Sequence, residues 1–346
     1  MRSILLAGAA LCALTLGATG AAAQTAAPAY AVTKTVALGA PDRWDYLTYD
    51  APTHRVYVAH GDRLTVVDSQ SGAVLGEVIG MPGGSHGIGL ADGKGYTDDG
   101  KAGEVIVFDP ASFKVLRQIP AKPDADGIAV DPTTGHVFVV DGDSAAITVI
   151  DPASDTVIAT IDGGGGLEAP VAGPSGKLYV NGAEKKEILR VDTASNTVDA
   201  RWPVPTCTSP HGIALDAADH RLFVSCVNQL MVVLNTDTGA VVASLPIGHG
   251  TDAAGFDPVR KLAFSSNGDG TLSVIGQTGP DTYNVAETVT TQPTGRTTAI
   301  DPASGRIFVA AADIDTSAPE TVSPNGWHRP KLAPGSLKLL IIDPAH

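Results

Sequence analysis

Two short patterns recur seven times along this chain of 346 residues, at a spacing of about 41–44 residues. The first is a basic residue, an apolar residue, an aromatic residue and usually valine, as in RVYV (55–58) and RIFV (306–309). The second is an apolar run that usually ends in aspartate, as in ITVID (147–151). Short alternating strands that recur about every 40 residues are typical of propeller blades. The repeat therefore predicts an all-β, seven-bladed β-propeller with four antiparallel strands in each blade.

The two ends of the chain are expected to meet in one blade. The last repeat, 294–346, ends after its third strand at LLIID (339–343). The alternating segment 31–38 (AVTKTVAL) precedes the first complete repeat and supplies the missing fourth strand. Closure by this N-terminal strand would leave no long open sheet edge. It predicts a single domain over 31–346 and a monomer.

The first 23 residues have the features of a secretory signal, with Arg2, an apolar stretch and the small residues Ala21-Ala22-Ala23. We expect cleavage after Ala23, a flexible leader over 24–30, and a periplasmic or secreted protein. No later segment is long and apolar enough to predict membrane insertion. Cys207 and Cys226 remain after processing, and in an oxidising compartment such a pair is expected to form a disulfide.

The charge of the chain narrows the classes of partner. Its formal net charge is -14, from 23 Lys+Arg and 37 Asp+Glu. Binding to nucleic acid generally depends on basic side chains that neutralise phosphates, so nucleic acid is not expected as a partner. The sequence lacks a C-x-x-C-H motif, which excludes covalently attached c-type haem. A small molecule or a periplasmic protein is the expected partner.

The last repeat contains an insertion at about 315–336. The second pattern ends at Gly276 in blade six and at Asp343 in blade seven, 67 residues later, against 41–43 elsewhere. A long insertion in one repeat usually maps to a functional loop on one face. Trp327, His328 and Arg329 lie in this segment and are expected to fold over the channel as a lid.

Alignment of the repeats reveals one mostly polar column, where the chain enters the innermost strand of each blade. Innermost strands line the central channel of a propeller, so these side chains should surround one mouth of it. In blades one to seven the residues are Asp45, His86, Asp126, Leu167 with Glu168 beside it, His211, Asp252 and Arg296. The insertion should open at the same mouth, since it joins the second and third strands of its blade. His60 and His249 are also expected in loops of this face.

This ring predicts a ligand site, but two other interpretations are open. Asp-Gly and His-Gly are turn dipeptides, so Asp126-Gly127 and His211-Gly212 could serve only to turn the chain. A divalent metal is also an alternative, because imidazole and carboxylate are common ligands. The candidate metal ligands are His86, His211, Asp126 and Asp252. The identity of any other cofactor is left open.

Several repeat segments resemble the YVTN-repeat (YncE-like) β-propeller family. The segments that carry the resemblance are GIAVD (127–131), HVFVVD (136–141), ITVIDPAS (147–154) and Tyr179-Val180-Asn181-Gly182. The resemblance covers essentially residues 31–346 and implies an exported, seven-bladed propeller. Members have no established enzymatic residues, so it assigns no catalytic residue here. The broader superfamily includes lactonase-like propellers and the propeller subunits of quinoprotein amine dehydrogenases.

Three functions follow as hypotheses, and whether the protein is an enzyme stays open. We favour a binding or scaffold protein that holds a small ligand or a protein partner at the ringed mouth. The second hypothesis is a lactonase-type hydrolase or lyase, with or without a metal. It would use His86 or His211 as general base, and Arg296 to bind an anionic group. The third is a non-catalytic propeller subunit of a redox complex.

Overall fold

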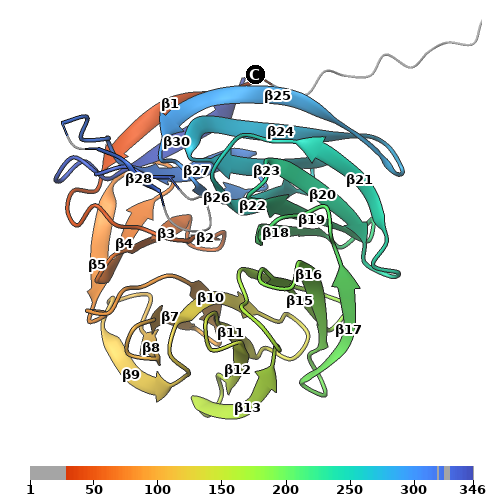
Figure 1. Ribbon diagram of the computed structural model, residues 1–346. Helices are drawn as coiled ribbons and strands as arrows, with labels where there is room; N and C mark the ends of the chain where they lie inside the picture. Colours follow the sequence, from red (N-terminus) through yellow and green to blue (C-terminus); the bar gives the residue numbers. More distant parts are fainter. Residues whose placement is uncertain (1–28, 318, 323–327, 346) are drawn as a thin grey trace, which may run out of the picture.

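The computed structural model describes residues 29–317, 319–322 and 328–345, which form seven four-stranded antiparallel sheets around a central axis (Figure 1). The predicted seven-bladed propeller is confirmed. The predicted signal, 1–23, and most of the leader lie outside the described residues. Within the described ranges, no helix has the length and apolar character needed to cross a membrane.

The first four blades take their strands from consecutive parts of the chain. Blade 1 contains β2 (Leu47–Asp50), β3 (Arg55–His60), β4 (Arg63–Asp68) and β5 (Val74–Ile79). Blade 2 contains β6 (Ile88–Ala91), β7 (Lys94–Asp99), β8 (Glu104–Phe108) and β9 (Val115–Pro120). Blade 3 contains β10 (Ala125–Val130), β11 (Val137–Asp141), β12 (Ala146–Asp151) and β13 (Thr156–Asp162). Blade 4 contains β14 (Pro170–Gly173), β15 (Lys177–Gly182), β16 (Glu187–Asp192) and β17 (Thr197–Pro203).

The last three blades end with the one that closes the ring. Blade 5 contains β18 (Pro210–Asp216), β19 (Arg221–Cys226), β20 (Leu230–Asn235) and β21 (Val241–Pro246). Blade 6 contains β22 (Thr251–Asp257), β23 (Leu262–Asn267), β24 (Asp269–Gly279) and β25 (Thr282–Pro293). Blade 7 contains β26 (Thr297–Asp301), β27 (Arg306–Ala311), β30 (Lys338–Pro344) and, as its outermost strand, β1 (Tyr30–Ala37).

The N-terminal strand closes the ring as predicted, because β1 pairs antiparallel with β30 from Tyr30 opposite Pro344 to Ala37 opposite Lys338. The strand begins one residue earlier than the segment expected from the sequence. Blade 7 also packs on blade 1 through a buried apolar cluster that includes Phe308 and Leu339 from one blade and Val56 from the other. The seam between the chain ends is therefore packed like the other interfaces between blades.

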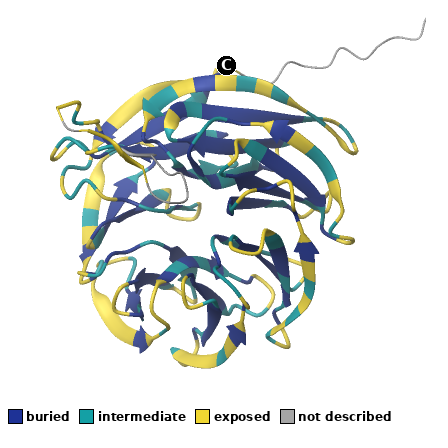
Figure 2. Cartoon of the chain, viewed as in Figure 1, coloured by how far each residue is buried: buried dark blue, intermediate teal, exposed yellow. Residues whose placement is uncertain are grey.

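Burial follows the position of each strand within its blade (Figure 2). Five of the six residues of β3 are buried, whereas the outermost strand β5 has a single fully buried residue. The core thus consists of apolar layers between neighbouring sheets, and the outermost strands form the wall of the cylinder.

The basic residue that opens the first repeat pattern also joins blades at several copies, whereas Lys177 pairs with Asp192 and Asp199 of its own blade. The guanidinium of Arg55 in blade 1 donates to the carbonyl of Pro110 in blade 2, with 2.6 Å between nitrogen and oxygen. Arg306 of blade 7 donates in the same way to the carbonyl of Ser69 in blade 1, at 2.7 Å. Both acceptors lie in the turn after the third strand of the next blade. The pattern therefore specifies a contact between blades as well as a strand.

In blades 1, 2, 3 and 5, the last residue of the second strand fastens the loop by which the chain enters the blade, and we call this residue the loop anchor. In blade 2, the carboxylate of Asp99 accepts a hydrogen bond from the backbone N–H of Gly83, at 3.1 Å. In blade 3, Asp141 accepts one from the backbone N–H of Lys122, at 3.2 Å. In blade 5 the loop anchor is Cys226, which forms a disulfide with Cys207 in the entering loop.

His60 is the loop anchor of blade 1 and is fully buried at the end of β3. Its Nε2 lies 2.7 Å from the carbonyl oxygen of Pro41, and its Nδ1 lies 2.8 Å from Oγ1 of Thr65. Burial lowers the pKa of His60, so Nε2–H of a neutral ring donates to Pro41. His60 contacts the loop that enters the blade, which agrees with the expected face, but it lies at the end of strand β3 and is buried, so its expected place in a loop is wrong.

Reduction of the Cys207–Cys226 disulfide should destabilise the protein. The bond closes a loop with a sequence separation of 19 residues, which corresponds to about 3 kcal/mol of restricted unfolded-chain entropy. We expect urea unfolding of the Cys207→Ala/Cys226→Ala variant to show a loss of about 2–4 kcal/mol. A reductant should reduce the stability of the wild-type protein and leave that of the variant unchanged. Equal stability of the two proteins without reductant would contradict this expectation.

Candidate functional site

Five of the ring residues predicted from the sequence line one cavity of about 1100 Å³, which we call the mouth cavity. They come from blades 1, 4, 5, 6 and 7 and are Asp45, Glu168, His211, Asp252 and Arg296. His86 and Asp126, from blades 2 and 3, lie beside them: the charge of His86 lowers the pKa of Asp45 and of Asp126, and the charge of Asp126 raises the pKa of His86. Leu167 instead packs in the buried core, so Glu168 represents blade 4 at the mouth.

Three ring residues lie in β-bulges at the start of an innermost strand. The pairing of β10 with β11 is interrupted around Asp126, that of β18 with β19 around His211, and that of β22 with β23 around Asp252. A bulge leaves a residue unpaired and changes the direction of its side chain. The local backbone therefore turns these side chains toward the mouth.

The glycines that follow the ring residues allow neighbouring inner strands to approach closely. A Cβ on Gly212 would collide with the backbone of Ala253 and Ala254 in blade 6, and one on Gly127 would meet the ring of Pro170 in blade 4. Neither glycine has a positive φ, and both lie within strands. The interpretation of these His-Gly and Asp-Gly pairs as turns is therefore wrong.

Below the mouth, the inner strands enclose a narrow channel of about 150 Å³. Its walls are formed largely by small or apolar residues such as Gly87, Gly127, Ala169 and Gly212, with Tyr46 among them. Sites for small ligands usually measure about 300–1,000 Å³, so the mouth cavity has the appropriate size and the channel does not.

Arg296 connects blades 6, 7 and 1 at the edge of the mouth. Its Nε lies 2.7 Å from a carboxylate oxygen of Asp252, and its Nη2 donates to the carbonyl of Trp44 at 3.1 Å. The guanidinium carbon lies 4.9 Å from the centre of the Trp44 ring, a cation–π contact. Arg296 is therefore held in one orientation and neutralises Asp252.

His86 is held by Asp98, a residue at the end of β7. Nδ1 of His86 lies 2.6 Å from one carboxylate oxygen, and the other oxygen accepts the backbone N–H groups of His86 and Gly87. Burial alone would lower the pKa of His86, but the hydrogen bond and the charges of Asp98 and Asp45 raise it to about 10. Nη2 of Arg43 lies 3.2 Å from Nε2, so protonation of Nε2 and this hydrogen bond from Arg43 exclude each other.

Three carboxyl groups at the mouth bind their protons more tightly than usual. Burial, together with the charge of Asp252, raises the pKa of Asp45 to about 6. Burial and the neighbouring carboxylates also raise the pKa of Asp126 and of Glu168 well above their usual values. Burial and nearby negative charge both disfavour the ionised form of a carboxyl group. Groups with strongly shifted pKa values are concentrated at functional sites.

The sequence did not single out several residues of the site. Asp98 holds His86, whereas Arg43, Trp44 and Asp269 line the mouth cavity. Asp98 directly follows KGYT (94–97), a copy of the first repeat pattern that has glycine and threonine in place of the apolar residue and valine. This polar substitution was the signal that could have indicated Asp98. Arg43 and Trp44 lie in the loop before β2, and Asp269 is the first residue of β24; the repeat carries no pattern at these positions.

The insertion of blade 7 reaches the mouth cavity through Ile314, Glu320, Pro330 and Leu332. It folds back on itself, since β28 (Thr321–Val322) pairs with β29 (His328–Arg329) and Ile314 bridges to Leu332. Trp327 and the side chains of His328 and Arg329 lie outside the described part of the chain, so the lid stays a prediction.

The metal prediction is not tested by the geometry of the ring. Among the residues that the structure describes, no group of three or more His, Cys, Asp or Glu side chains is arranged to hold a metal ion. His211 Nε2 approaches Glu168 at 3.5 Å. A metal at His86, His211, Asp126 and Asp252 stays a prediction, which the metal content of the purified protein would test.

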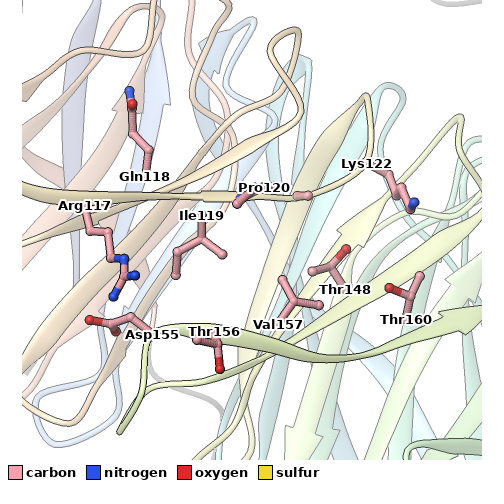
Figure 3. A pocket seen from close by; sticks show the side chains of 11 residues that line it. Arg117, Gln118, Ile119, Pro120, Lys122, Thr148, Asp155, Thr156, Val157 and Thr160 are labelled. Atoms are coloured by element: carbon pink, nitrogen blue, oxygen red, sulfur yellow. The ribbon is translucent and has the colours of Figure 1, made fainter.

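A second hollow, of about 420 Å³, lies on the outer wall between blades 2 and 3 (Figure 3). It is lined by the outermost strands β9 and β13, with Arg117 and Lys122 on one side and Thr156 and Val157 on the other. None of the predicted ring residues lines it. The ring predicted from the sequence therefore does not contribute to this hollow.

Replacement of Asp45 by asparagine should stabilise the protein at neutral pH. The pKa of Asp45 is about 6 in the fold against 3.8 ordinarily, so the ionised carboxyl destabilises the folded state as the pH rises from about 4 to 6. We expect Asp45→Asn to increase the unfolding free energy at pH 8 by about 1–2 kcal/mol, and to change it little at pH 4.

Asp62→Asn is the matched control in these denaturation experiments. The hydrogen bond from Arg63 lowers the pKa of Asp62, so this replacement should slightly decrease stability at pH 8. A loss of stability in Asp45→Asn at pH 8 would show that the ionised carboxyl is stabilised in the fold.

Comparison with known proteins gives one family and one fold. The sequence profile of a family described as "Domain of unknown function (DUF5074)" matches residues 47–245. A search of the curated proteins found no match. The YVTN-repeat resemblance therefore stays a prediction.

Among solved structures, one titled "Crystal Structure of Mitotic Checkpoint Complex" is similar with a TM-score of 0.70 and 16% identity, over 88% of this chain and 96% of that chain. "Structure of U3-55K" is similar with a TM-score of 0.76 and 10% identity, over 90% of this chain and 99% of that chain. At these identities the similarity supports the fold alone.

Proposed function

The chain belongs to the DUF5074 family, and from the geometry of its ring we propose that it is a binding protein that holds a small ligand in the mouth cavity. The observation that carries this proposal is the arrangement of Asp45, Asp126 and Glu168. Three carboxyl groups with raised pKa values gather beside one large cavity, at a cost to the stability of the fold. Such a cost is typical of binding and active sites.

The double variant Asp126→Asn/Glu168→Gln should lose ligand affinity without unfolding. We expect a thermal-shift screen of small metabolites to identify compounds that stabilise the wild-type protein. Calorimetric titration of these compounds should give a dissociation constant at least about tenfold higher in the double variant, since charge and hydrogen-bond acceptors are removed from the site.

Glu77→Gln serves as the control, because Glu77 lies on the outermost strand of blade 1 and pairs with Arg63. This variant should bind the same compounds as the wild-type protein. Compounds that bind the wild-type protein and the double variant equally would place the ligand elsewhere and contradict the proposed site.

A hydrolase or lyase is a second candidate, favoured by the 2.6 Å contact between His86 and Asp98. A carboxylate on Nδ1 orients the imidazole for proton transfer at Nε2, once Arg43 moves away from Nε2. Because the pKa of His86 is raised to about 10, the ring would donate a proton as a general acid at neutral pH and act as a general base only in alkaline solution. If the protein hydrolyses lactones, we expect His86→Ala to lower kcat/KM by about 10²–10⁴ and Asp98→Asn to shift its pH profile. Unchanged turnover in His86→Ala would exclude this role for His86.

We further propose that the protein acts outside the cytoplasm, in the periplasm. The signal-like segment 1–23 and the disulfide between Cys207 and Cys226 support this location, since disulfides persist in oxidising compartments. A protein partner at the mouth and a role as a redox-complex subunit stay predictions, which purification of the native protein with its partners would test.

A further inference from the structure

We propose that the ligand of the mouth cavity is an organic cation, with an ammonium group bound over blades 3 and 4 and an apolar body that packs against the insertion of blade 7. This inference rests on the proposed function and specifies its ligand class. It follows from the distribution of charge and of apolar side chains around the cavity.

The charges at the mouth are unevenly paired. Asp252 is neutralised by Arg296 at 2.7 Å, and Asp98 by His86 at 2.6 Å. Asp126 and Glu168 have looser partners: the charge of His86 acts on Asp126, and Nε2 of His211 lies 3.5 Å from Glu168. The Oδ1 atom of Asp126 is buried and has no hydrogen-bond partner among the residues that the structure describes. A buried acceptor without a donor is unfavourable, and an N–H group of a bound ligand would supply the missing hydrogen bond.

Asp126 and Glu168 follow each other around the ring, without a basic ring residue between their blades. The charge of Glu168 raises the pKa of Asp126, so the two groups are close enough to repel each other when both are ionised. A cation placed between two such carboxylates relieves their mutual repulsion and gains charge-assisted hydrogen bonds. This side of the mouth therefore suits an ammonium group.

The opposite side of the mouth offers apolar surface among paired charges. Arg43 and Arg296 line the cavity there together with Asp252, Asp269 and Glu320, and Arg296 pairs with Asp252. Beside them, Ile314, Pro330 and Leu332 of the insertion form an apolar wall, and Ile314 is 39% exposed. Blade 7 lies across the ring from blades 3 and 4 (Figure 1).

This arrangement favours an organic cation over an inorganic one. A cavity of about 1100 Å³ exceeds the volume that a hydrated metal ion needs, and apolar walls contribute nothing to its binding. The hydrocarbon part of an amine would cover Ile314 and Leu332 and remove apolar surface from water. The two sides of the cavity thus select for the two parts of one molecule.

Three matched probes test the ligand class by calorimetric titration at pH 7.5: 4-phenylbutylamine, the neutral 4-phenylbutanol and the anionic 4-phenylbutyrate. We expect the amine to bind with a dissociation constant on the order of 1 mM or lower. The alcohol should bind at least about tenfold more weakly, and the acid more weakly still. Calcium chloride is titrated in parallel as an inorganic cation and should not displace the amine.

Variants then test the position of the amine. Asp126→Asn/Glu168→Gln should weaken amine binding at least about tenfold and leave alcohol binding unchanged. Leu332→Ala should weaken amine binding several-fold and leave the binding of methylammonium unchanged. Glu77→Gln should behave as the wild-type protein, and circular dichroism confirms that each variant is folded.

The outcomes separate this inference from the proposed function. The proposal of an organic cation would be overturned if the amine did not bind, if the alcohol or the acid bound more tightly, or if calcium displaced the amine. If other compounds still bound the wild-type protein and not the double variant, the mouth would remain the ligand site. Equal binding of the amine to the double variant would overturn its proposed position.

Discussion

The crowding of like charges at the mouth depends on how firmly the backbone of the entering loops is fixed. Unfixed loops would let the carboxylates of Asp45, Asp126 and Glu168 separate into water. The loop anchors His60 and Asp141 fix the entering loops of Asp45 and Asp126. A backbone hydrogen bond from Glu168 to Asn181 fixes the third loop. These contacts use no ring side chain. The packing of the blades therefore offsets the repulsion between the carboxylates, and the ring side chains remain available for a ligand.

Most of the fold could be predicted from the sequence, because a propeller repeats one local pattern. The two repeat patterns predicted the inner strands of each blade. The short last repeat predicted that an N-terminal strand, β1, completes blade 7. The contacts of Arg55 and Arg306 with the next blade explain why the first pattern begins with a basic residue. That reason became visible only when the blades were seen side by side.

The site was predicted only in outline, for a related physical reason. The column of ring residues follows from the repeat, since equivalent positions of a ring converge on one axis. The role of Gly127 and Gly212 depends on the distance between strands of neighbouring blades, which a single sequence does not contain. Asp98 and Arg43 were missed because their partner, His86, is reached through space, and His60 was misplaced because a polar ring can be satisfied inside a blade.

The seam between the chain ends runs through the mouth itself. Arg296 and Thr297 of blade 7 donate to the carbonyls of Trp44 and Asp45 in blade 1, across 252 positions of sequence. During synthesis, Trp44 and Asp45 are made early, but their partners Arg296 and Thr297 are made only when most of the chain is complete. A truncated chain would lack the completed mouth however well its other blades packed. A molecule bound across this seam would act as a clasp, since it would favour the closed ring over any state in which the ends have parted.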